Sequence, residues 1–194
     1  PYIINGTENV IAVRLDTKKW DSRWYPGAGI YRNVWLVKTA PVHISYNGVF
    51  CTTPEIKKAK AVLSVSTDVE SHLNEPIPVT IKVYVYKLAK ESSKTPALVA
   101  TSGDYTALIP AMKMHTFRLD LSIPDPILWD IENPELYSLL VTVIKEGKVV
   151  DVIETITGLR TLNFTARDGF LLNGKRVEVK GVCNHHDLGA LGAA

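Results

Sequence analysis

The 194-residue sequence contains little cysteine and no long apolar run. Its two cysteines, Cys51 and Cys183, lie far apart and lack the partner spacing of a disulfide framework or a metal clip. We therefore expect two free, buried thiols. No segment reaches the roughly eighteen consecutive apolar residues that a membrane-spanning helix requires. Nothing in the sequence indicates a cellular compartment.

An excess of charge of either sign is also missing. Lysine and arginine total 22 and aspartate and glutamate total 20, which gives a formal net charge of +2. Proteins that bind polyanions usually carry a clear basic excess, so we expect neither a nucleic-acid nor a membrane partner. The 46% share of apolar residues excludes disordered and collagen-like chains and is typical of globular proteins.

No stretch shows the spacing of an amphipathic helix over three turns. Instead, apolar residues alternate with polar ones, which is the period of a strand with one wet face. Such strands are predicted over residues 63–70, 79–86 and 116–121, and apolar stretches predict further strands over residues 9–16, 137–144 and 149–157. The last two are joined by Glu146, Gly147 and Lys148, a short hairpin loop that contains glycine.

The central region, residues 42–158, is close in length to the roughly 100 residues of an immunoglobulin-like sandwich. We therefore predict an antiparallel β-sandwich for this region. The Cys…Trp…Cys signature of antibody domains is absent, so only the architecture is implied.

Residues 21–32 combine aromatic, arginine and glycine residues in a stretch too irregular for a strand or a helix. Trp24 could stack on a sugar face while Asp21 and Arg23 bond to hydroxyl groups, as in many small-molecule sites. Alternatively, Trp24 and Tyr31 fill a domain interface. Composition alone favours the interface interpretation.

Residues 168–187 predict a strand, a turn at Asn173 and Gly174, and a second strand. The second strand ends in four polar side chains, Asn184, His185, His186 and Asp187. Such a group suits a ligand site on the rim of a barrel, or else a network that only fixes the rim. Adjacent histidines on a strand point to opposite faces, so this pair does not suggest a metal site. Spacing also permits a Ser-His-Asp triad, but no Gly-x-Ser-x-Gly motif occurs.

Six stretches in collinear order resemble glycoside hydrolase family 2, and within it the beta-galactosidases most. They are residues 9–16, 22–36, 128–139, 158–160, 169–175 and 180–187. Six matches in order are far more specific than any one of them, and together they span nearly the whole chain.

The resemblance implies an all-β chain with three parts. Residues 1–40 would be the last strands of a sugar-binding jelly-roll, residues 41–159 a complete immunoglobulin-like sandwich, and residues 160–194 the opening hairpin and first strand of a (β/α)8 barrel. Such a barrel takes roughly 250 residues. We therefore expect a piece of a longer enzyme with incomplete flanking domains.

The family's retaining mechanism uses two glutamates about 5 to 5.5 Å apart, one as acid and one as nucleophile. The resemblance places both on later barrel strands, outside this chain. Glu132 and Glu135 belong to a Trp-x-x-Glu-Asn-Pro motif, and Glu178 lies in the rim hairpin, so none of them inherits a catalytic role. We expect the full-length enzyme to cleave terminal beta-galactosides and this chain to hydrolyse nothing.

The resemblance also implies residues that bind substrate. Relatives carry an acidic jelly-roll residue at the sugar pocket, and its position aligns near Ser22 or Arg23. The nearest carboxylate, Asp21, is offset from it. His185, His186 and Asp187 would lie where the first barrel strand ends and would orient other groups beside the pocket.

The implied partners are a carbohydrate substrate, reached through the full-length enzyme, and the remaining domains of that enzyme. A homo-oligomer is compatible with the sequence. We expect no cofactor and no metal of functional weight. Other hypotheses are a beta-glucuronidase or beta-mannosidase of the same family, a free-standing carbohydrate-binding module, and a structural spacer.

Overall fold

The computed structural model describes residues 3–4, 6–16, 30, 33–89 and 95–183. The chain divides into two compact units, Lys38–Lys180 and a second made of Pro1–Val37 with Gly181–Ala194. Every strand that the described residues form lies in the unit Lys38–Lys180.

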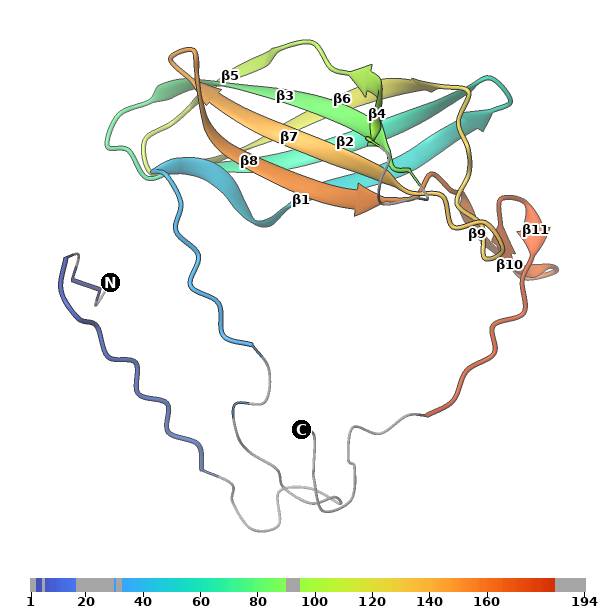
Figure 1. Cartoon of the computed structure of the whole chain (residues 1–194), viewed down its shortest axis with the longest axis horizontal. Coiled ribbons are helices and arrows are strands. Elements are labelled where there is room, and N and C mark those ends of the chain that lie inside the picture. Colours follow the sequence, from blue (N-terminus) through green and yellow to red (C-terminus); the bar gives the residue numbers. More distant parts are fainter. Residues whose placement is uncertain (1–2, 5, 17–29, 31–32, 90–94, 184–194) are drawn as a thin grey trace. The chain divides into compact units, whose positions relative to one another are not determined.

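The unit Lys38–Lys180 is built from two facing antiparallel sheets (Figure 1). One sheet has the order β1-β2-β6, with β1 at Val42–Lys57, β2 at Lys60–Ser71 and β6 at Met114–Pro124. The other has the order β4-β3-β7-β8, with β3 at Ile77–Lys87, β4 at Ala97–Thr101, β7 at Tyr137–Lys145 and β8 at Lys148–Thr157. β5, Tyr105–Ile109, also pairs with β3.

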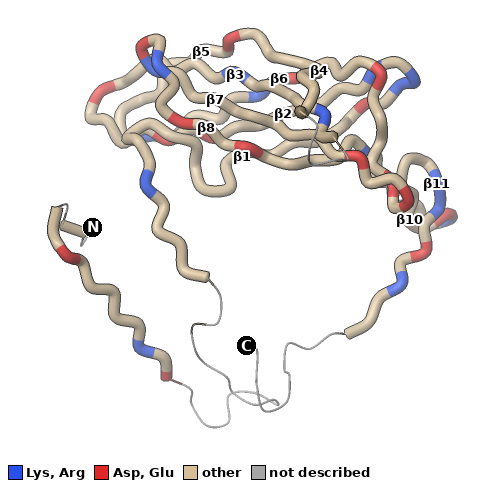
Figure 2. The backbone as a smooth tube through the Cα atoms, in the orientation of Figure 1, with Lys and Arg blue, Asp and Glu red and all other residues tan. Residues whose placement is uncertain are grey.

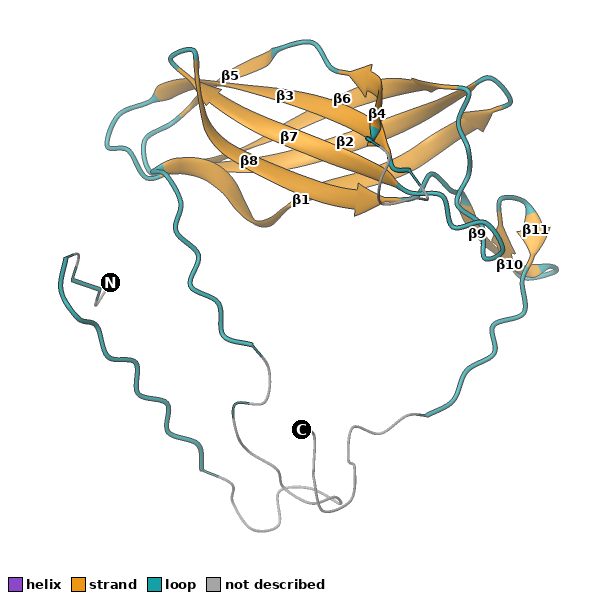
Figure 3. Cartoon of the chain, in the orientation of Figure 1, coloured by secondary structure: helices purple, strands orange, loops and turns teal. Residues whose placement is uncertain are grey.

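A third, smaller sheet follows the sandwich in the sequence. It consists of β9 (Leu162–Thr165), β10 (Gly169–Leu172) and β11 (Lys175–Arg176), paired in the order β11-β10-β9. Figure 3 shows only strands and loops in the described part of the chain. The structure thus confirms the predicted all-β fold with an antiparallel immunoglobulin-like sandwich.

The core lies between the two large sheets and follows the alternation of the sequence. Along β2, Leu63, Val65, Thr67 and Val69 are at most 2% exposed, whereas the residues that alternate with them are partly exposed. β3 buries Val79, Ile81, Val83 and Val85 in the same manner. Each such side chain contributes about 1.5 to 3 kcal/mol by leaving water, so these facing rows dominate the stability of the fold.

The predicted hairpin between β7 and β8 is present. Lys145 pairs with Lys148, so the loop has two residues, Glu146 (φ 51°) and Gly147 (φ 74°). Two successive positive φ angles define a type I′ turn, whose twist matches that of the flanking strands.

β1 does not follow simple alternation, and the sequence did not predict it. Its register with β2 shifts between Ile44 and Val49 and again between Thr52 and Glu55. In the first irregularity Asn47 has a φ of 55°, and the Ile44 amide donates to the Asp151 carboxylate at 2.8 Å. Because Asp151 lies on β8, this bond joins the edges of the two sheets.

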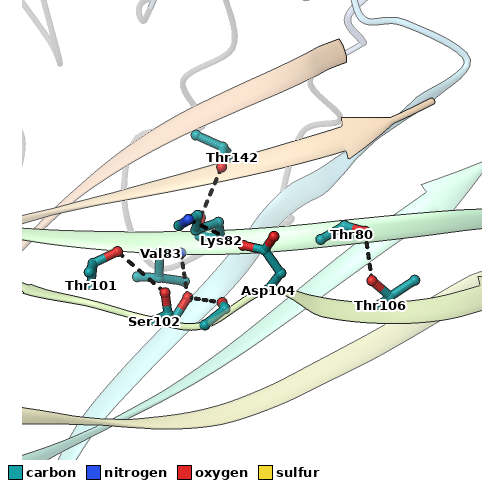
Figure 4. A network of polar contacts seen from close by, with 9 residues as sticks. Thr80, Lys82, Val83, Thr101, Ser102, Asp104, Thr106 and Thr142 are labelled. Carbon is teal, nitrogen blue, oxygen red and sulfur yellow. Dashed lines mark hydrogen bonds and ion pairs between the residues drawn. The ribbon is translucent and has the colours of Figure 1, made fainter. Parts of the chain in front are cut away.

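A polar network marks the point where β4 gives way to β5 along the same edge of β3 (Figure 4). The Ser102 amide donates to the Val83 carbonyl at 2.8 Å, and the Ser102 hydroxyl accepts from the Val83 amide at 2.9 Å. The same hydroxyl donates to the Gly103 carbonyl at 2.7 Å, and the Lys82 ammonium lies 3.2 Å from the Asp104 carboxylate. The side chain of Ser102 therefore replaces a ladder bond where the strand is interrupted.

Tyr137 closes one end of the sandwich. It begins β7, is 1% exposed, and its hydroxyl accepts from the Ile127 amide at 3.0 Å. A buried tyrosine that bonds to backbone upstream of its strand resembles the tyrosine corner of immunoglobulin-like sandwiches.

One predicted strand is absent, and another is shorter than expected. Residues 6–16 pair with no other strand among the described residues, and Val10 and Ile11 are 84% and 83% exposed. The strand predicted after the Asn173-Gly174 turn ends at Arg176, and residues 177–183 carry no ladder. Alternation alone does not make a strand, because a strand needs a hydrogen-bonded neighbour.

The prediction of two buried thiols is also wrong in part. Both cysteines are free, as expected, but Cys51 is half-buried and Cys183 is exposed. Cys183 lies in the segment that forms no ladder, so no neighbouring strand covers it.

In Figure 2 the positions of Lys and Arg and those of Asp and Glu are interspersed along the sandwich. In the part of the chain that the structure describes, no helix is long and apolar enough to cross a membrane.

Candidate functional site

The most distinctive feature of the unit is the joint between the sandwich and the sheet β9–β11. Beside it lies a pocket of about 490 Å³, within the usual size range of ligand pockets. Its walls come from the middle of β1 and from the segment that leaves β8. The lining residues are Phe50, Cys51, Thr52, Thr53, Pro54, Thr157, Gly158, Arg160, Thr161 and Leu162.

Trp129 is the centre of the joint. Its amide donates to the Leu159 carbonyl at 2.9 Å, and the Arg160 guanidinium lies 5.3 Å from the centroid of its ring. The guanidinium also donates to the Gly158 carbonyl at 3.2 Å. A cation over an indole face is attractive, so Arg160 holds the ring against the chain that leaves β8.

Gly158 permits this packing because it has no side chain. A Cβ atom at this position would lie 2.6 Å from the Trp129 Cβ, far inside contact distance. The close approach of the backbone to the indole therefore requires glycine, although the φ of Gly158 is not in the left-handed region.

Asn173 fastens the tip of the hairpin to the joint. Its side-chain amide donates to the Trp129 carbonyl at 2.9 Å, and its side-chain oxygen accepts from the Thr161 amide at 3.0 Å. Its own amide donates to the Thr161 carbonyl at 3.0 Å. Asn173 and Gly174 have φ angles of 50° and 76°, which asparagine and glycine tolerate best. The turn thus also serves as a clamp.

Three of the stretches that carried the family resemblance meet at this joint. Trp129 comes from residues 128–139, Arg160 from residues 158–160, and Asn173 from residues 169–175. The sequence singled out each stretch separately, and no spacing rule indicates that they touch. The Asn-Gly turn gave the one local signal, and it predicted the hairpin but not the clamp.

The joint has the features of a positioning element and not of a hydrolytic centre. None of the described residues that line the pocket is a carboxylate, whereas glycoside hydrolysis of this type needs a pair. Glu135 is buried and lies 4.0 Å from the Lys87 ammonium, and Glu132 and Glu178 are exposed. That none of these three acids has a catalytic role stays a prediction.

The substrate-binding residues predicted from the sequence all lie outside the described residues, and their roles stay predictions. They are Asp21, Arg23, Trp24, His185, His186 and Asp187.

The family model for Glycosyl hydrolases family 2 matches residues 42–160, which span the sandwich and reach the joint. The chain belongs to this family. The family resemblance read from the sequence is thereby confirmed.

Similar proteins include both beta-galactosidases and beta-glucuronidases. The beta-galactosidase BoGH2A of Bacteroides ovatus is 40% identical over 100% of this chain and 22% of its own length. A putative beta-glucuronidase of Formosa agariphila is 31% identical over 96% of this chain and 17% of its own length. The crystal structure of a family 2 member from Bacteroides cellulosilyticus matches 80% of this chain and 20% of that chain, with a TM-score of 0.70 and 30% identity.

This chain spans about a fifth of the length of these relatives. The family is therefore established, whereas the choice between the two activities is not fixed by membership.

Proposed function

We propose that this chain is the segment of a retaining beta-galactosidase that links the sugar-binding domain to the catalytic barrel, and that it hydrolyses no glycoside by itself. The observation that carries the specificity is the 40% identity to BoGH2A over the whole chain. In this proposal residues 1–40 complete the sugar-binding domain, residues 41–159 form the sandwich, and residues 160–194 open the barrel.

The joint explains how such a segment serves catalysis without a catalytic acid. Arg160, Trp129 and Asn173 fix the direction in which the chain leaves the sandwich and enters the hairpin. Two glutamates that act on one anomeric carbon tolerate little displacement, because an error of about 1 Å in position costs about a hundredfold in rate. A rigid joint ahead of the barrel limits that error.

The proposal also gives roles to residues at the two ends. Asp21, Arg23 and Trp24 contribute to the sugar pocket from the sugar-binding domain. His185, His186 and Asp187 orient neighbouring groups at the end of the first barrel strand. The substrate is a terminal beta-galactoside.

A beta-glucuronidase is the second candidate. It is favoured by the Formosa agariphila relative, which aligns with 96% of this chain at 31% identity. The two candidates differ in the charge of the sugar, since a glucuronide carries a carboxylate and a galactoside does not.

Two chimeras separate these candidates. This chain replaces the matching segment in BoGH2A and, as the matched partner, in the Formosa agariphila protein. Each chimera is assayed with chromogenic beta-galactoside and beta-glucuronide. We expect the BoGH2A chimera to keep its kcat/KM for the galactoside within about tenfold, a loss below about 1.4 kcal/mol. The reverse pattern, a working glucuronidase chimera and an inactive galactosidase chimera, would overturn the assignment.

The chain alone tests the second half of the proposal. We expect no turnover of chromogenic beta-galactoside, beta-glucuronide or beta-mannoside above background. Galactose-dependent change in the fluorescence of the four tryptophans would instead favour a free-standing binding module.

A further inference from the structure

Three metal-binding side chains meet at the edge of the sandwich, away from the joint in sequence. His43 lies on β1, Glu70 on β2, and His72 directly follows β2. Each offers one ligand atom, and these atoms all lie within 4.8 Å of one another. The sequence gives no sign of this cluster, because His43 is far from Glu70 and His72 in the sequence and only the fold brings them together.

Strand pairing accounts for the cluster. His43 and Glu70 are directly paired across β1 and β2, so their side chains share one face of the sheet. His72 follows Glu70 by two residues, and its amide donates to the Pro41 carbonyl at 2.8 Å, which extends the pairing past the end of β2. All three side chains therefore point to the outer face, opposite the core.

A hydrogen bond to the backbone orients the ring of His43 for metal binding. The Nδ1 of His43 lies 2.9 Å from the Ala40 carbonyl oxygen, which only accepts, so Nδ1 donates this hydrogen bond and Nε2 is the ring nitrogen left for a metal. Histidines that ligate metals usually donate their other ring nitrogen in this way.

The distances suit a small tetrahedral ion. Two ligands at the usual 2.0 to 2.1 Å from zinc are about 3.3 Å apart. The Nε2 of His72 lies 3.4 Å from a carboxylate oxygen of Glu70. The rings of His43 and His72 are stacked with centroids 5.5 Å apart. The side chains of Glu70 and His72 are 36% and 55% exposed, so rotation is free to close the remaining gap.

We propose that His43, Glu70 and His72 form a binding site for a zinc ion, with water as the fourth ligand. Two imidazoles and one carboxylate are a donor set that zinc accepts and that calcium and magnesium do not. The ion joins the start of β1 to the end of β2, where the chain enters the sandwich. Its role is to stabilise that edge.

The test is calorimetric titration of the full chain with zinc chloride. His185, His186 and Cys183 also offer zinc ligands, so the reference protein carries the substitutions H185Q, H186Q and C183S. We expect the reference protein to bind one zinc ion. His43→Gln or His72→Gln should weaken that binding at least about tenfold, and Glu70→Gln should weaken it as well.

The matched control is His115→Gln. His115 lies on β6 against the ring of Phe117, outside the cluster, so this substitution should leave zinc affinity unchanged. A second readout is thermal unfolding, because an ion that binds the folded state raises Tm. At zinc about 100-fold above its dissociation constant, Tm of the reference protein should rise by about 5 to 10 °C, and His72→Gln should abolish the rise.

Circular dichroism without zinc shows whether each variant is folded. No zinc binding by the folded reference protein, or unchanged binding in folded His43→Gln, overturns the proposal. A crystal soaked in zinc adds a direct check, because an anomalous peak between these three side chains supports the site and a peak elsewhere contradicts it.

Discussion

At the scale of single residues, the hydroxyl of Tyr137 has a measurable role. It accepts from the Ile127 amide, and the ring is almost fully buried. Tyr137→Phe leaves that amide without its acceptor, so we expect the free energy of unfolding to fall by about 1 to 3 kcal/mol. Urea denaturation followed by circular dichroism measures it. Tyr46→Phe is the control, because Tyr46 is 88% exposed and should show no change.

The same hydroxyl links stability to pH. Burial raises the pKa of Tyr137, and the charge of Glu135 raises it further, against a hydrogen bond with Ile127 that lowers it. The folded state therefore holds this proton more tightly than the unfolded chain, whose tyrosines titrate near about 10. The resulting stability is complete below that pH and is lost as pH rises through the folded value. The difference between wild type and Tyr137→Phe should thus shrink above about pH 10. A constant difference would contradict this.

Two buried threonines, Thr67 and Thr142, differ in the hydrogen bonding of their hydroxyl groups. The hydroxyl of Thr67 is buried and has no hydrogen-bond partner among the residues that the structure describes, whereas that of Thr142 donates to the Lys82 carbonyl at 3.1 Å. Valine keeps the branched shape of both. Thr67→Val should stabilise the protein by about 1 kcal/mol because a desolvated polar group is removed, and Thr142→Val should destabilise it by about 1 kcal/mol. Equal effects in urea denaturation would show that hydrogen bonding does not distinguish the two sites.

At the scale of elements, the packing of Trp129 on the chain that leaves β8 depends on Gly158. An alanine Cβ would overlap the indole side chain. We expect Gly158→Ala to lower the free energy of unfolding by about 1 to 3 kcal/mol, as overpacking does. Gly103→Ala is the matched control, because a Cβ at Gly103 meets nothing within 4 Å. Similar melting temperatures for the two variants would mean that Trp129 moves aside at little energetic cost.

The side-chain hydrogen bonds of Asn173 hold the sheet β9–β11 against the sandwich, so we expect the hairpin to open more often as these bonds are removed. Asn173→Ala removes two side-chain hydrogen bonds, each worth about 1 kcal/mol, and should raise opening of the hairpin about tenfold or more. Asn173→Asp keeps the acceptor for Thr161 and loses only the donor, so it should raise opening about fivefold. The rate of trypsin cleavage at Arg167 reports the opening. Cleavage at the wild-type rate in Asn173→Ala would show that other contacts hold the hairpin.

The elements predicted correctly from the sequence are those whose own residues carry the signal. β2, β3 and β6 alternate cleanly between apolar and polar residues, and β7 and β8 are rich in apolar and β-branched residues, so each of them carries a local signal for a strand. The turns at Glu146 and Gly147 and at Asn173 and Gly174 follow from residues that accept positive φ.

The elements that the sequence missed depend on contacts between distant residues. β1 is a strand although Asn47 interrupts its alternation, because β2 supplies a partner on both sides of the irregularity. β4 and β5 are short and share one edge of β3. Residues 9–16 are rich in apolar residues and yet form no ladder among the described residues. In the joint, Asn173 bonds to Trp129, which lies 44 positions away in the sequence. The periodicity of a sequence does not reveal contacts of this kind.

At the scale of the whole molecule, the hydrophobic core that the described residues form lies inside one unit. All members of the core cluster fall between Val42 and Leu159, within Lys38–Lys180. Leu172, on the hairpin, is also buried within this unit. We therefore expect the unit Lys38–Lys180 to fold by itself.

This independence predicts the behaviour of shortened chains. A chain of residues 38–180 should unfold in one cooperative transition, with a melting temperature within about 2 °C of the full chain, because no core contact is removed. A chain of residues 38–158 is the comparison. It lacks the fully buried Leu159 and the Asn173 clamp, so its melting temperature should fall by more than about 5 °C. Differential scanning calorimetry measures both. If residues 38–180 failed to fold while the full chain did, the outer segments would have to supply stability that the sandwich lacks, and the spacer role would need them.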